Sequence, residues 1–423
     1  MHLTFLGATQ TVTGSRYLLQ ACGRRVLIDC CLFQGYKNLR LKNWQPLPVD
    51  ASTVSAVVLT HAHLDHSGYL PVLIKQGFLG PVYATRATAE LCGSLLPDSG
   101  HLQEEQAQFA NRHRYSKHSP ALPLYTEEEA IASLDRLRRV DFAEEIRLGS
   151  DLTFSFSRAG HLLGAASVHV RHGEKSVLFS GDIGRPNDPL MPAPASPPRS
   201  DFVVIESTYG DRTHSPVDPQ EQLRDLVLET HRRHGVILIP AFAVGRAQLL
   251  MLMIARLKAR AEIPDIPVFL DSPMAIDETD SLLRFRNEHR LGEEDIERLR
   301  HAAVHVHTPD QSRQLDTLRQ PAIIISASGM ATGGRILHHL KVYGPDARNL
   351  ILFAGYQAGG TRGAALVGGA QSVRIHGEDV AINAQVAQLD TLSAHADANE
   401  LIAWLSRMPG RPRRVFITHG EPA

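Results

Sequence analysis

The stretch Thr60-His61-Ala62-His63-Leu64-Asp65-His66 indicates the fold of this chain most directly. Between positions 61 and 66 it carries four side chains that can ligate a metal. The apolar run Val57-Val58-Leu59 before it is typical of a buried strand, and Ser67-Gly68-Tyr69-Leu70-Pro71 after it is typical of a helix start. We therefore expect the cluster in a tight turn at the carboxyl end of a strand, where α/β folds place their chemistry.

The side chains of this cluster are of the kind that binds zinc or a similar divalent ion, because neutral imidazoles and carboxylates suit such metals. One ion cannot easily take all four ligands from so short a turn. We expect two neighbouring ions to divide them, with His61 and His63 on one and Asp65 and His66 on the other. The alternative is a polar turn with chance histidines, but the H-x-H-x-D-H spacing is too specific to favour it.

Three later segments predicted as strands lead to one metal-binding side chain each, beside glycine. The strands are expected at 152–156, 176–180 and 414–418, and the side chains are His161, Asp182 and His419. Glycine at such places lets the backbone bend tightly and lets a ligand approach closely. A single histidine in this setting is more often a hydrogen-bonded core or surface residue. Together with the cluster at 61–66, the three side chains favour a metal site.

Further motifs follow in order along nearly the whole chain. Besides those above they are Leu27-Ile28-Asp29-Cys30, Glu206-Ser207-Thr208-Tyr209-Gly210-Asp211-Arg212, Ser326-Ala327-Ser328-Gly329-Met330, Gly355-Tyr356-Gln357-Ala358, Leu392-Ser393-Ala394-His395-Ala396-Asp397 and Thr418-His419-Gly420-Glu421. With this set the chain resembles the metallo-β-lactamase superfamily and, more narrowly, its β-CASP branch of nucleases. That branch includes the endonuclease subunit of the eukaryotic pre-mRNA cleavage and polyadenylation complex and its bacterial and archaeal relatives. The histidine cluster alone would indicate only the superfamily, whereas the motifs of Glu206, His395 and His419 indicate the branch.

The resemblance implies an α/β fold, a metallo-β-lactamase αββα sandwich with an inserted α/β β-CASP domain. From the alternation of strands and helices we expect residues 1–208 to form the first part of the sandwich. Residues 209–368 are then the inserted domain, and residues 369–423 return to the sandwich with His395 and His419. The active site is expected between the two domains.

The resemblance also implies a role for each candidate site residue. His61, His63 and His161 resemble the ligands of a first zinc ion, and Asp65, His66 and His419 those of a second. Asp182 would bridge the two ions, and Asp29 resembles a carboxylate that orients a ligating imidazole from behind.

Two further residues resemble the acid–base machinery of the family. His395 resembles the general acid, and Glu206 the carboxylate that holds it in place. Without the resemblance, Glu206 reads equally well as a helix-capping or surface carboxylate. His395 reads equally well as an N-terminal helix residue beside Asp397.

The function implied is that of a zinc-dependent ribonuclease in RNA processing or decay. It would hydrolyse single-stranded RNA by a two-metal mechanism and leave a 5′-phosphate and a 3′-hydroxyl. In this family a histidine as the last ligand, as His419 is here, goes with RNA nucleases, and a valine with DNA repair nucleases. Two alternatives stay open, a hydrolase of the same fold that acts on DNA or another phosphodiester, and a catalytically weak RNA-binding subunit of a larger complex.

A segment rich in small residues is a candidate for phosphate contacts. Its candidate residues are Ser326, Ser328, Gly329 and Thr332, in a turn that we expect to join a strand to a helix start. Backbone N–H groups at such a turn can hold a phosphate. Arg246 is a further candidate, since a guanidinium grips phosphate in a bidentate way. The alternatives are a plain glycine-rich turn and a solvated arginine.

Composition neither requires nor excludes a nucleic-acid partner. Of 423 residues, 44 are Lys or Arg and 45 are Asp or Glu, so the net charge of −1 leaves no electrostatic footprint for nucleic acid, which argues against tight non-specific RNA binding.

The four cysteines match no zinc or disulfide spacing and indicate reduced thiols. The longest apolar stretch, 249–255, is too short to cross a membrane, and the start of the chain lacks a signal peptide, so we expect a cytoplasmic protein. The oligomeric state stays open, a homo-oligomer included.

Three departures from the family pattern concern the site. Cys31 stands where relatives usually carry glycine, and Ala364 where many carry arginine, which bears on substrate affinity or end recognition. The sequence stops at Ala423, four residues after His419, where relatives usually continue into a closing helix. A shortened C-terminus is expected to loosen the last zinc ligand.

Overall fold

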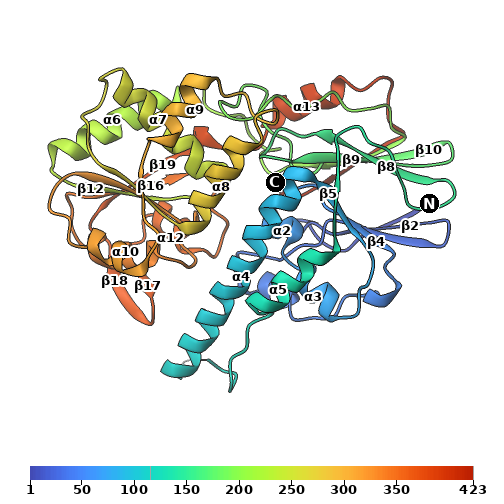
Figure 1. Ribbon diagram of the computed structural model, residues 1–423, viewed down its shortest axis with the longest axis horizontal. Helices are drawn as coiled ribbons and strands as arrows, with labels where there is room; N and C mark the ends of the chain where they lie inside the picture. Colours follow the sequence, from blue (N-terminus) through green and yellow to red (C-terminus); the bar gives the residue numbers. More distant parts are fainter. Residues whose placement is uncertain (115, 423) are drawn as a thin grey trace. The chain divides into compact units, whose positions relative to one another are not determined.

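The computed structural model describes residues 1–114 and 116–422. This part of the chain forms two compact units (Figure 1). The first comprises Met1–Thr213 together with the chain from Ala394 on, and the second comprises His214–Ser393. The second unit therefore continues past Gly368, the end expected from the sequence. The physical reason is that strand β19 (Gln385–Leu389) pairs with β16 (Leu350–Ala354) of the second unit rather than with the first.

The first unit is built on two six-stranded sheets. The first sheet has the order β1 (His2–Phe5), β2 (Tyr17–Ala21), β3 (Arg24–Ile28), β4 (Ala56–Val58), β5 (Val82–Thr85), β6 (Leu137–Val140). The second has the order β20 (Arg414–Thr418), β11 (Phe202–Glu206), β10 (Lys175–Phe179), β9 (Ala166–His172), β8 (Leu152–Arg158), β7 (Ile146–Arg147). The strands expected at 57–59, 152–156, 176–180 and 414–418 are among them.

The core of the first unit lies between these two sheets. Alternating apolar residues such as Leu152, Phe154 and Phe156 of β8 point inward and are at most 1% exposed. They pack against Val26 and Ile28 of β3 in one continuous hydrophobic cluster. Burial of this apolar surface holds the two sheets face to face.

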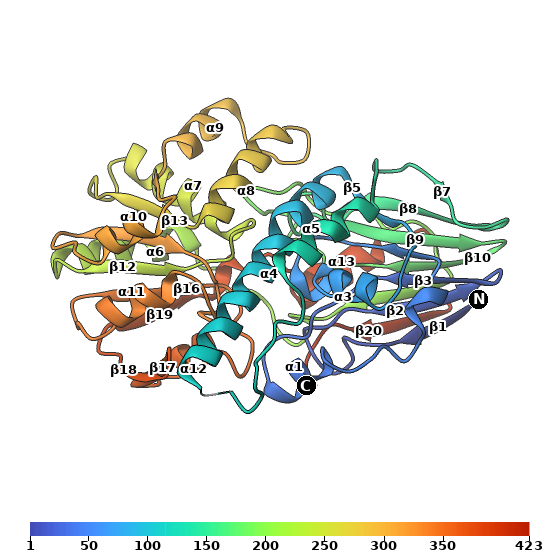
Figure 2. The ribbon, with the colours of Figure 1, turned by 60° about the horizontal axis from the view of Figure 1, so that its bottom comes forward.

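Helices cover the outer faces of this sandwich. Those of the first unit are α1 (Lys37–Lys42), α2 (Leu64–Ser67), α3 (Leu70–Lys75), α4 (Arg86–His113), α5 (Glu127–Ser133) and α13 (Ala398–Ser406), with short 3₁₀ turns η1 (Ala51–Thr53) and η2 (Leu134–Arg136). Figures 1 and 2 show α3, α4 and α5 on one side of the sheets and α13 on the other. The layers are thus helix, sheet, sheet and helix, the αββα arrangement expected from the sequence.

Two further segments of the first unit flank the sandwich. Helix α4 begins at Arg86 and runs through Pro97, because the hydroxyl of Thr85 caps the first turn and Leu91, Leu95 and Leu96 bury its inner face. The proline-rich stretch 188–198 is an ordered loop with buried Leu190 and Met191. Tyr115, which follows the end of α4, lies outside the described residues.

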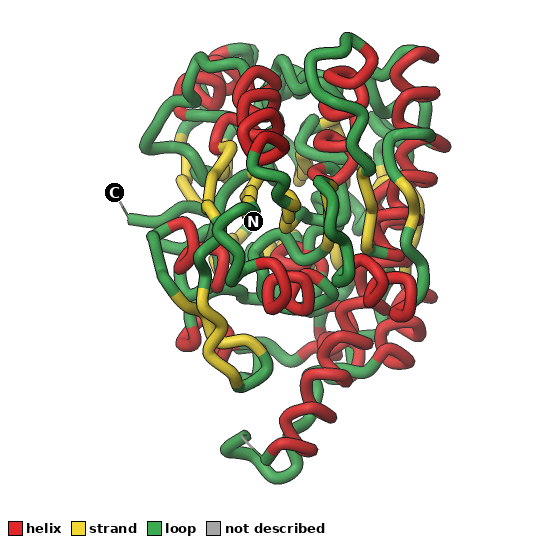
Figure 3. Tube along the Cα trace, turned by 90° about the vertical axis from the view of Figure 1, so that its left-hand side faces the viewer, coloured by secondary structure: helices red, strands yellow, loops and turns green. Residues whose placement is uncertain are grey.

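The second unit is a parallel sheet with helices on both faces (Figure 1, Figure 3). Its strand order is β14 (Val304–His305), β13 (Val268–Asp271), β15 (Ala322–Ser326), β12 (Val236–Pro240), β16, β19, and a hairpin of β17 (Ser372–Ile375) and β18 (Glu378–Ala381) stands apart. The helices are α6 (Pro219–Arg232), α7 (Arg246–Ala259), α8 (Pro273–Arg284), α9 (Glu293–Arg300), α10 (Pro309–Leu315), α11 (Ile336–Tyr343) and α12 (Arg362–Val367), with a 3₁₀ turn η3 (Asp390–Leu392). The central strands read as unbroken apolar runs, since both faces of the sheet are covered.

No helix among the described residues is long and apolar enough to span a bilayer.

Candidate metal centre

The candidate metal ligands of the first unit lie just past the ends of strands. The turn 60–66 follows β4, and β8, β10 and β20 lead to His161, Asp182 and His419, while the orienting carboxylate Asp29 follows β3. Strand β11 runs parallel to both β10 and β20, so the carboxyl ends of these strands share one edge of the sheet. The same edge of the sandwich therefore gathers side chains that are up to 358 positions apart in sequence (His61 to His419).

A first group of side chains consists of His61, His63, His161 and Asp182. One ligand atom of each lies within 4.8 Å of the others. His63 Nδ1 lies 3.2 Å from His61 Nε2 and 3.3 Å from His161 Nε2. Asp182 Oδ2 lies 3.5 Å and 3.7 Å from those same Nε2 atoms. Three ring nitrogens and one carboxylate oxygen thus converge on one point.

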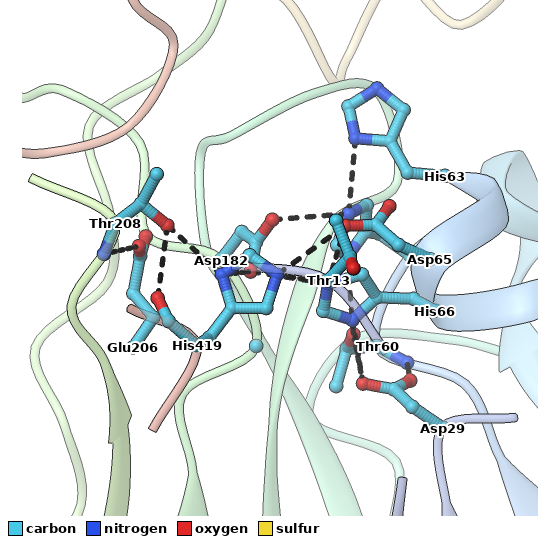
Figure 4. A network of polar contacts seen from close by, with 12 residues as sticks. Thr13, Asp29, Thr60, His63, Asp65, His66, Asp182, Glu206, Thr208 and His419 are labelled. Atoms are coloured by element: carbon cyan, nitrogen blue, oxygen red, sulfur yellow. Dashed lines mark hydrogen bonds and ion pairs between the residues drawn. The ribbon is translucent and has the colours of Figure 1, made fainter. Parts of the chain in front are cut away.

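A second group consists of Asp65, His66 and His419, again within 4.8 Å of one another (Figure 4). The Nε2 atoms of His66 and His419 are 3.3 Å apart, and Asp65 Oδ2 is 3.4 Å from His419 Nε2. Thr208 orients the last ring. Its hydroxyl donates to the carbonyl of His419 at 3.3 Å and lies 2.9 Å from His419 Nδ1. With Nδ1 held by Thr208, Nε2 of His419 faces the group.

Asp182 stands between the two groups and presents one oxygen to each. Oδ2 faces the first group, whereas Oδ1 lies 3.3 Å from His66 Nε2 and 3.7 Å from His419 Nδ1. The side chain is 2% exposed, and Oδ1 accepts no hydrogen bond from the described residues. Burial alone would raise the pKa of Asp182, but the surrounding imidazoles outweigh it and hold the pKa well below its ordinary value.

Asp29 fixes the histidine turn from behind. Its Oδ2 accepts from His66 Nδ1 at 2.8 Å and from the Thr60 hydroxyl at 2.9 Å, and its Oδ1 accepts from the Thr60 backbone N–H at 2.7 Å. Burial would lower the pKa of His66, but Asp182 and Asp29 outweigh it and raise that pKa well above its ordinary value. With Nδ1 held by Asp29, Nε2 is the ring nitrogen directed at the second group. Thr60 had no role in the sequence-based prediction, and Thr208 had none either. A hydroxyl next to a predicted ligand is the one signal that could have found them.

The histidines of the first group are held as neutral imidazoles. Burial is the main cause that lowers the pKa of His61 and His161 well below the ordinary value and the pKa of His63 to about 4. A neutral imidazole offers a lone pair, which is the form that binds a metal.

His395 and Glu206 form a pair at the edge of the two groups. His395 Nδ1 lies 3.1 Å from both carboxylate oxygens of Glu206, and His395 Nε2 lies 3.9 Å from Asp182 Oδ2. Glu206 is buried at the end of β11, where the backbone N–H groups of Ile183 and Thr208 donate to its oxygens. Burial would lower the pKa of His395, but Glu206 and Asp182 raise it to about 9. The geometry leaves Nε2 of His395 directed toward the metal groups.

A divalent cation fits this arrangement. Ring nitrogens of the neutral imidazoles His61, His63 and His161 converge at 3.2–3.3 Å, and a cation among them would take up their lone pairs. The buried Asp182 Oδ1 also lacks a donor among the described residues. The donors are imidazole nitrogens and carboxylate oxygens, the set that zinc takes in hydrolytic enzymes.

The candidate phosphate-binding residues lie in the second unit. Ser326 is 1% exposed and its hydroxyl donates to the Asp271 carbonyl at 2.9 Å, so it holds β13 to β15. The turn after β15 leads to helix α11, which begins at Ile336, so it joins a strand to a helix start as expected. The hydroxyls of Ser328 and Thr332 lie 3.0 Å apart. Arg246, the first residue of α7, is buried rather than solvated.

The positions that depart from the family pattern lie in ordinary surroundings. Cys31 is fully buried beside the histidine turn, and its carbonyl accepts from Arg16 Nη2 at 2.8 Å. Ala364 lies in the first turn of α12, where its N–H donates to the Thr361 hydroxyl. Of the four cysteines, Cys22 is exposed and the others are buried, all as free thiols.

Three stretches of the chain match known family models. Residues 11–227 match the metallo-beta-lactamase superfamily, residues 247–366 the Beta-Casp domain, and residues 379–423 the Zn-dependent metallo-hydrolase RNA specificity domain. Among solved structures, a protein of unknown function from Enterococcus faecalis V583 matches 99% of this chain and 93% of its own, with a TM-score of 0.52 and 14% identity. That likeness concerns the fold alone.

Similar proteins of curated function cover the whole chain. Ribonuclease TTHA0252 of Thermus thermophilus is 38% identical over 100% of this chain and 93% of its own length. Transcription termination factor FttA of Methanosarcina mazei is 31% identical over 100% of this chain and 67% of its own length. An RNase J-like protein of Methanocaldococcus jannaschii is 29% identical over 99% of this chain and 92% of its own.

Proposed function

Since the chain belongs to the metallo-β-lactamase superfamily and to its β-CASP branch, we propose that it is a zinc-dependent ribonuclease that hydrolyses RNA with two metal ions. Family membership confirms the resemblance drawn from the sequence motifs and the αββα fold with an inserted β-CASP domain. It also makes the protein a metal-dependent hydrolase. The substrate, the metal and the number of ions are the proposal.

One observation carries the proposal, the division of seven potential ligands into two groups that share Asp182. His61, His63 and His161 would hold the first ion, and Asp65, His66 and His419 the second. Bound there, two zinc ions would supply Lewis acidity that lowers the pKa of water and neutralises charge on a phosphodiester.

The other residues of the site orient and move protons. Glu206 grips Nδ1 of His395 with both oxygens, so the ring can turn little and Nε2 keeps its direction. A proton on Nε2 would pass to the leaving oxygen of the RNA, which then departs as a 3′-hydroxyl and leaves a 5′-phosphate on the other product. Asp29 and Thr208 each hold the distal nitrogen of a ligating ring, His66 and His419 respectively, which fixes the tautomer.

The names of the relatives favour RNA as the substrate, whereas the net charge of the chain does not. The relative that is 38% identical is named a ribonuclease, and the model matched by residues 379–423 is named for RNA specificity. Transcription termination is not transferred, because the chain spans about two thirds of the length of the termination factors it resembles.

The test is metal content on purified protein beside cleavage of one labelled single-stranded RNA and its DNA counterpart. We expect about two zinc ions per chain. We also expect cleavage of the RNA that stops with a chelator and returns with added zinc, and RNA products with a 5′-phosphate. Two bound zinc ions without cleavage of either strand would overturn the ribonuclease and point to another phosphodiester. RNA binding without cleavage in a two-metal protein would point to a subunit that acts by binding.

A further inference from the structure

The segment that leads away from the metal centre carries an unusual combination of exposed side chains. Tyr36 is 53% exposed and Trp44 is 58% exposed. They are the two aromatic side chains among the exposed large hydrophobic residues of the described chain, and they stand eight positions apart. Two exposed aromatic rings on one short segment form a candidate contact surface for a ligand with flat, stackable groups.

All charged side chains of this segment are positive. Between Asp29 and Asp50 the sequence contains Lys37, Arg40 and Lys42 and no carboxylate. All three cations are exposed, on helix α1, which is drawn in blue in Figure 2. The whole chain has a net charge of −1, so this is a local concentration of positive charge on a neutral protein.

The segment is held in shape from inside. The side chain of Asn43 donates to the Phe33 carbonyl at 2.9 Å and accepts from the Phe33 N–H at 2.8 Å, which closes the loop around α1. Phe33 and Leu47 are buried beneath it, and Lys42 Nζ lies 5.2 Å from the centre of the Phe33 ring. The rings and cations are thus presented on an ordered loop.

The segment is also attached to the metal-binding turn. The N–H of Cys30 donates to the His66 carbonyl, and the N–H of Leu32 donates to the Leu64 carbonyl at 2.8 Å. Tyr36 follows Asp29 by seven residues, so even a fully extended chain would place it at most about 25 Å from the floor of the metal centre. A stacked strand of about seven nucleotides spans that distance, at about 3.4 Å each.

We propose that the segment 36–44, here called the aromatic-basic loop, is a docking surface for the single-stranded RNA substrate, which it holds on the way to the metal centre. This inference rests on the proposed ribonuclease function, and it adds the surface on which the RNA substrate is bound. Bases stack on Tyr36 and Trp44, and Lys37, Arg40 and Lys42 neutralise phosphates. Aromatic rings interleaved with cations bind single strands without regard to sequence, because every base has a flat face and every nucleotide a phosphate. The loop supplies the positive charge that the composition of the chain lacks.

The sequence contains two tryptophans, which gives a direct probe. Trp404 is 3% exposed and its Nε1 donates to the Ala195 carbonyl, so an added polymer cannot reach it without unfolding. We therefore expect an uncleaved single strand, a 20-nucleotide oligo(dT), to quench the fluorescence of the zinc-loaded protein through Trp44. The quenching should disappear in Trp44→Phe and remain in Trp404→Phe.

Binding and kinetics then measure the contribution of the loop. Trp44→Ala should weaken binding of the 20-nucleotide strand by about 5- to 100-fold. Lys37→Ala should lower the slope of log affinity against log salt by about 0.7. On RNA both variants should raise KM with kcat unchanged, since the loop binds substrate and transition state alike. Lys175→Ala is the matched control, because Lys175 is an exposed cation at the start of β10, the end of the strand opposite to the carboxyl edge that leads to Asp182.

The outcomes separate this inference from the proposed function. Unchanged binding, salt slope and KM in Trp44→Ala and Lys37→Ala overturn the docking surface, even where RNA is cleaved. Quenching of Trp44 without any RNA cleavage supports the surface while the ribonuclease fails. A change of sedimentation in Trp44→Ala, with binding of the strand unaltered, shows that the loop joins two copies of the chain and overturns the proposal.

Discussion

The two units each bury a network of histidine and aspartate, and the networks differ in what they leave unsatisfied. In the second unit His339 is 0% exposed, its Nε2 lies 2.7 Å from Asp271 and its Nδ1 2.7 Å from Asp316. Asp271 also accepts from Ser312 and Arg335. In the first unit, ring nitrogens face other ring nitrogens, and the buried Asp182 Oδ1 accepts no hydrogen bond from the described residues.

The difference teaches how to tell a structural histidine from a ligand. Every polar atom of the His339 network that was described above has a partner of opposite character, so the network is complete without an added ion. In the metal centre, ring nitrogens of several histidines converge on one another and the buried Asp182 Oδ1 lacks a donor among the described residues, so a bound cation would complete the arrangement. Burial and nearby carboxylates are common to both networks, and the convergence of ring nitrogens distinguishes the metal centre.

The largest expected effect is at the shared carboxylate. Asp182→Asn removes the negative charge of the carboxylate that faces both groups, so we expect the protein to lose bound metal. We also expect RNA cleavage to fall by more than about 100-fold, which is a larger effect than that of replacing a residue that only orients a ligand. Metal analysis and single-turnover cleavage measure both. Asp271→Asn is the matched change in the complete network of the second unit, and it should leave the metal content of the protein unchanged. Two tightly held ions in Asp182→Asn would contradict the bridging role.

The second prediction separates proton transfer from metal binding. His395→Ala should keep both metals and lose cleavage by about 100- to 10,000-fold, because the general acid is removed while the ligand groups stay intact. An RNA with a good leaving group, which needs no protonation, should recover most of the rate. Unchanged turnover of ordinary RNA in this variant would remove His395 from the mechanism.

The third prediction breaks the complete network. His339→Leu leaves buried Asp271 without one of its partners, and we expect a loss of about 3–5 kcal/mol in the free energy of unfolding. Urea unfolding measures it, and zinc content should be unaffected. His338→Leu, an exposed neighbour, should cost less than about 0.5 kcal/mol. Equal costs at both positions would mean that the network adds nothing beyond packing.

The fourth prediction concerns orientation from behind the metal centre. Asp29→Asn keeps an oxygen at the site but weakens the hold on His66 Nδ1, so zinc affinity should fall by about 10- to 100-fold. Competition with a chelator measures the affinity. The fold should be preserved, as judged by the urea midpoint of the chelated protein. Unaltered affinity would show that the turn positions His66 without help from Asp29.

The smallest effect is a pH dependence of the complete network. Burial alone would lower the pKa of His339, but the bonds to Asp271 and Asp316 outweigh it and raise the pKa above 6.5. Burial would raise the pKa of Asp271, but its donors hold that pKa below 3.8. The contribution of the His339–Asp271 pair to the free energy of unfolding is therefore complete between pH 3.8 and 6.5. It is lost as the pH rises through the raised pKa of His339, and also as the pH falls through the lowered pKa of Asp271.

The measurement for this last prediction is the difference in unfolding free energy between the wild type and His339→Leu across pH. Taking the difference cancels the contributions of the titratable groups that both proteins share. We expect it to shrink above pH 6.5 by up to about 1.4 kcal/mol per pH unit for one proton. A difference independent of pH up to 9 would contradict the ion pairing of His339.

Much of the candidate site was predictable because it is local in sequence. The cluster at 61–66 lies within one turn, and His161, Asp182 and His419 each follow a strand that its apolar pattern predicts. The order of the motifs also indicated the family. Less predictable were contacts between distant hydroxyls and rings, such as that of Thr208 with His419 or of Ser326 with the Asp271 carbonyl, since a serine or threonine takes many roles in equal sequence surroundings.

The sequence by itself determined which side chains can bind metal, which segments form strands, and to which family the chain belongs, because these depend on residue type and short spacing. Only the tertiary structure decided which oxygen of Asp182 faces which group and that Glu206 grips His395 from another segment. It also decided that the second unit extends to Ser393 and that Tyr36 and Trp44 stay in solvent. Those properties depend on strand pairing and packing between residues far apart along the chain, which no local pattern encodes.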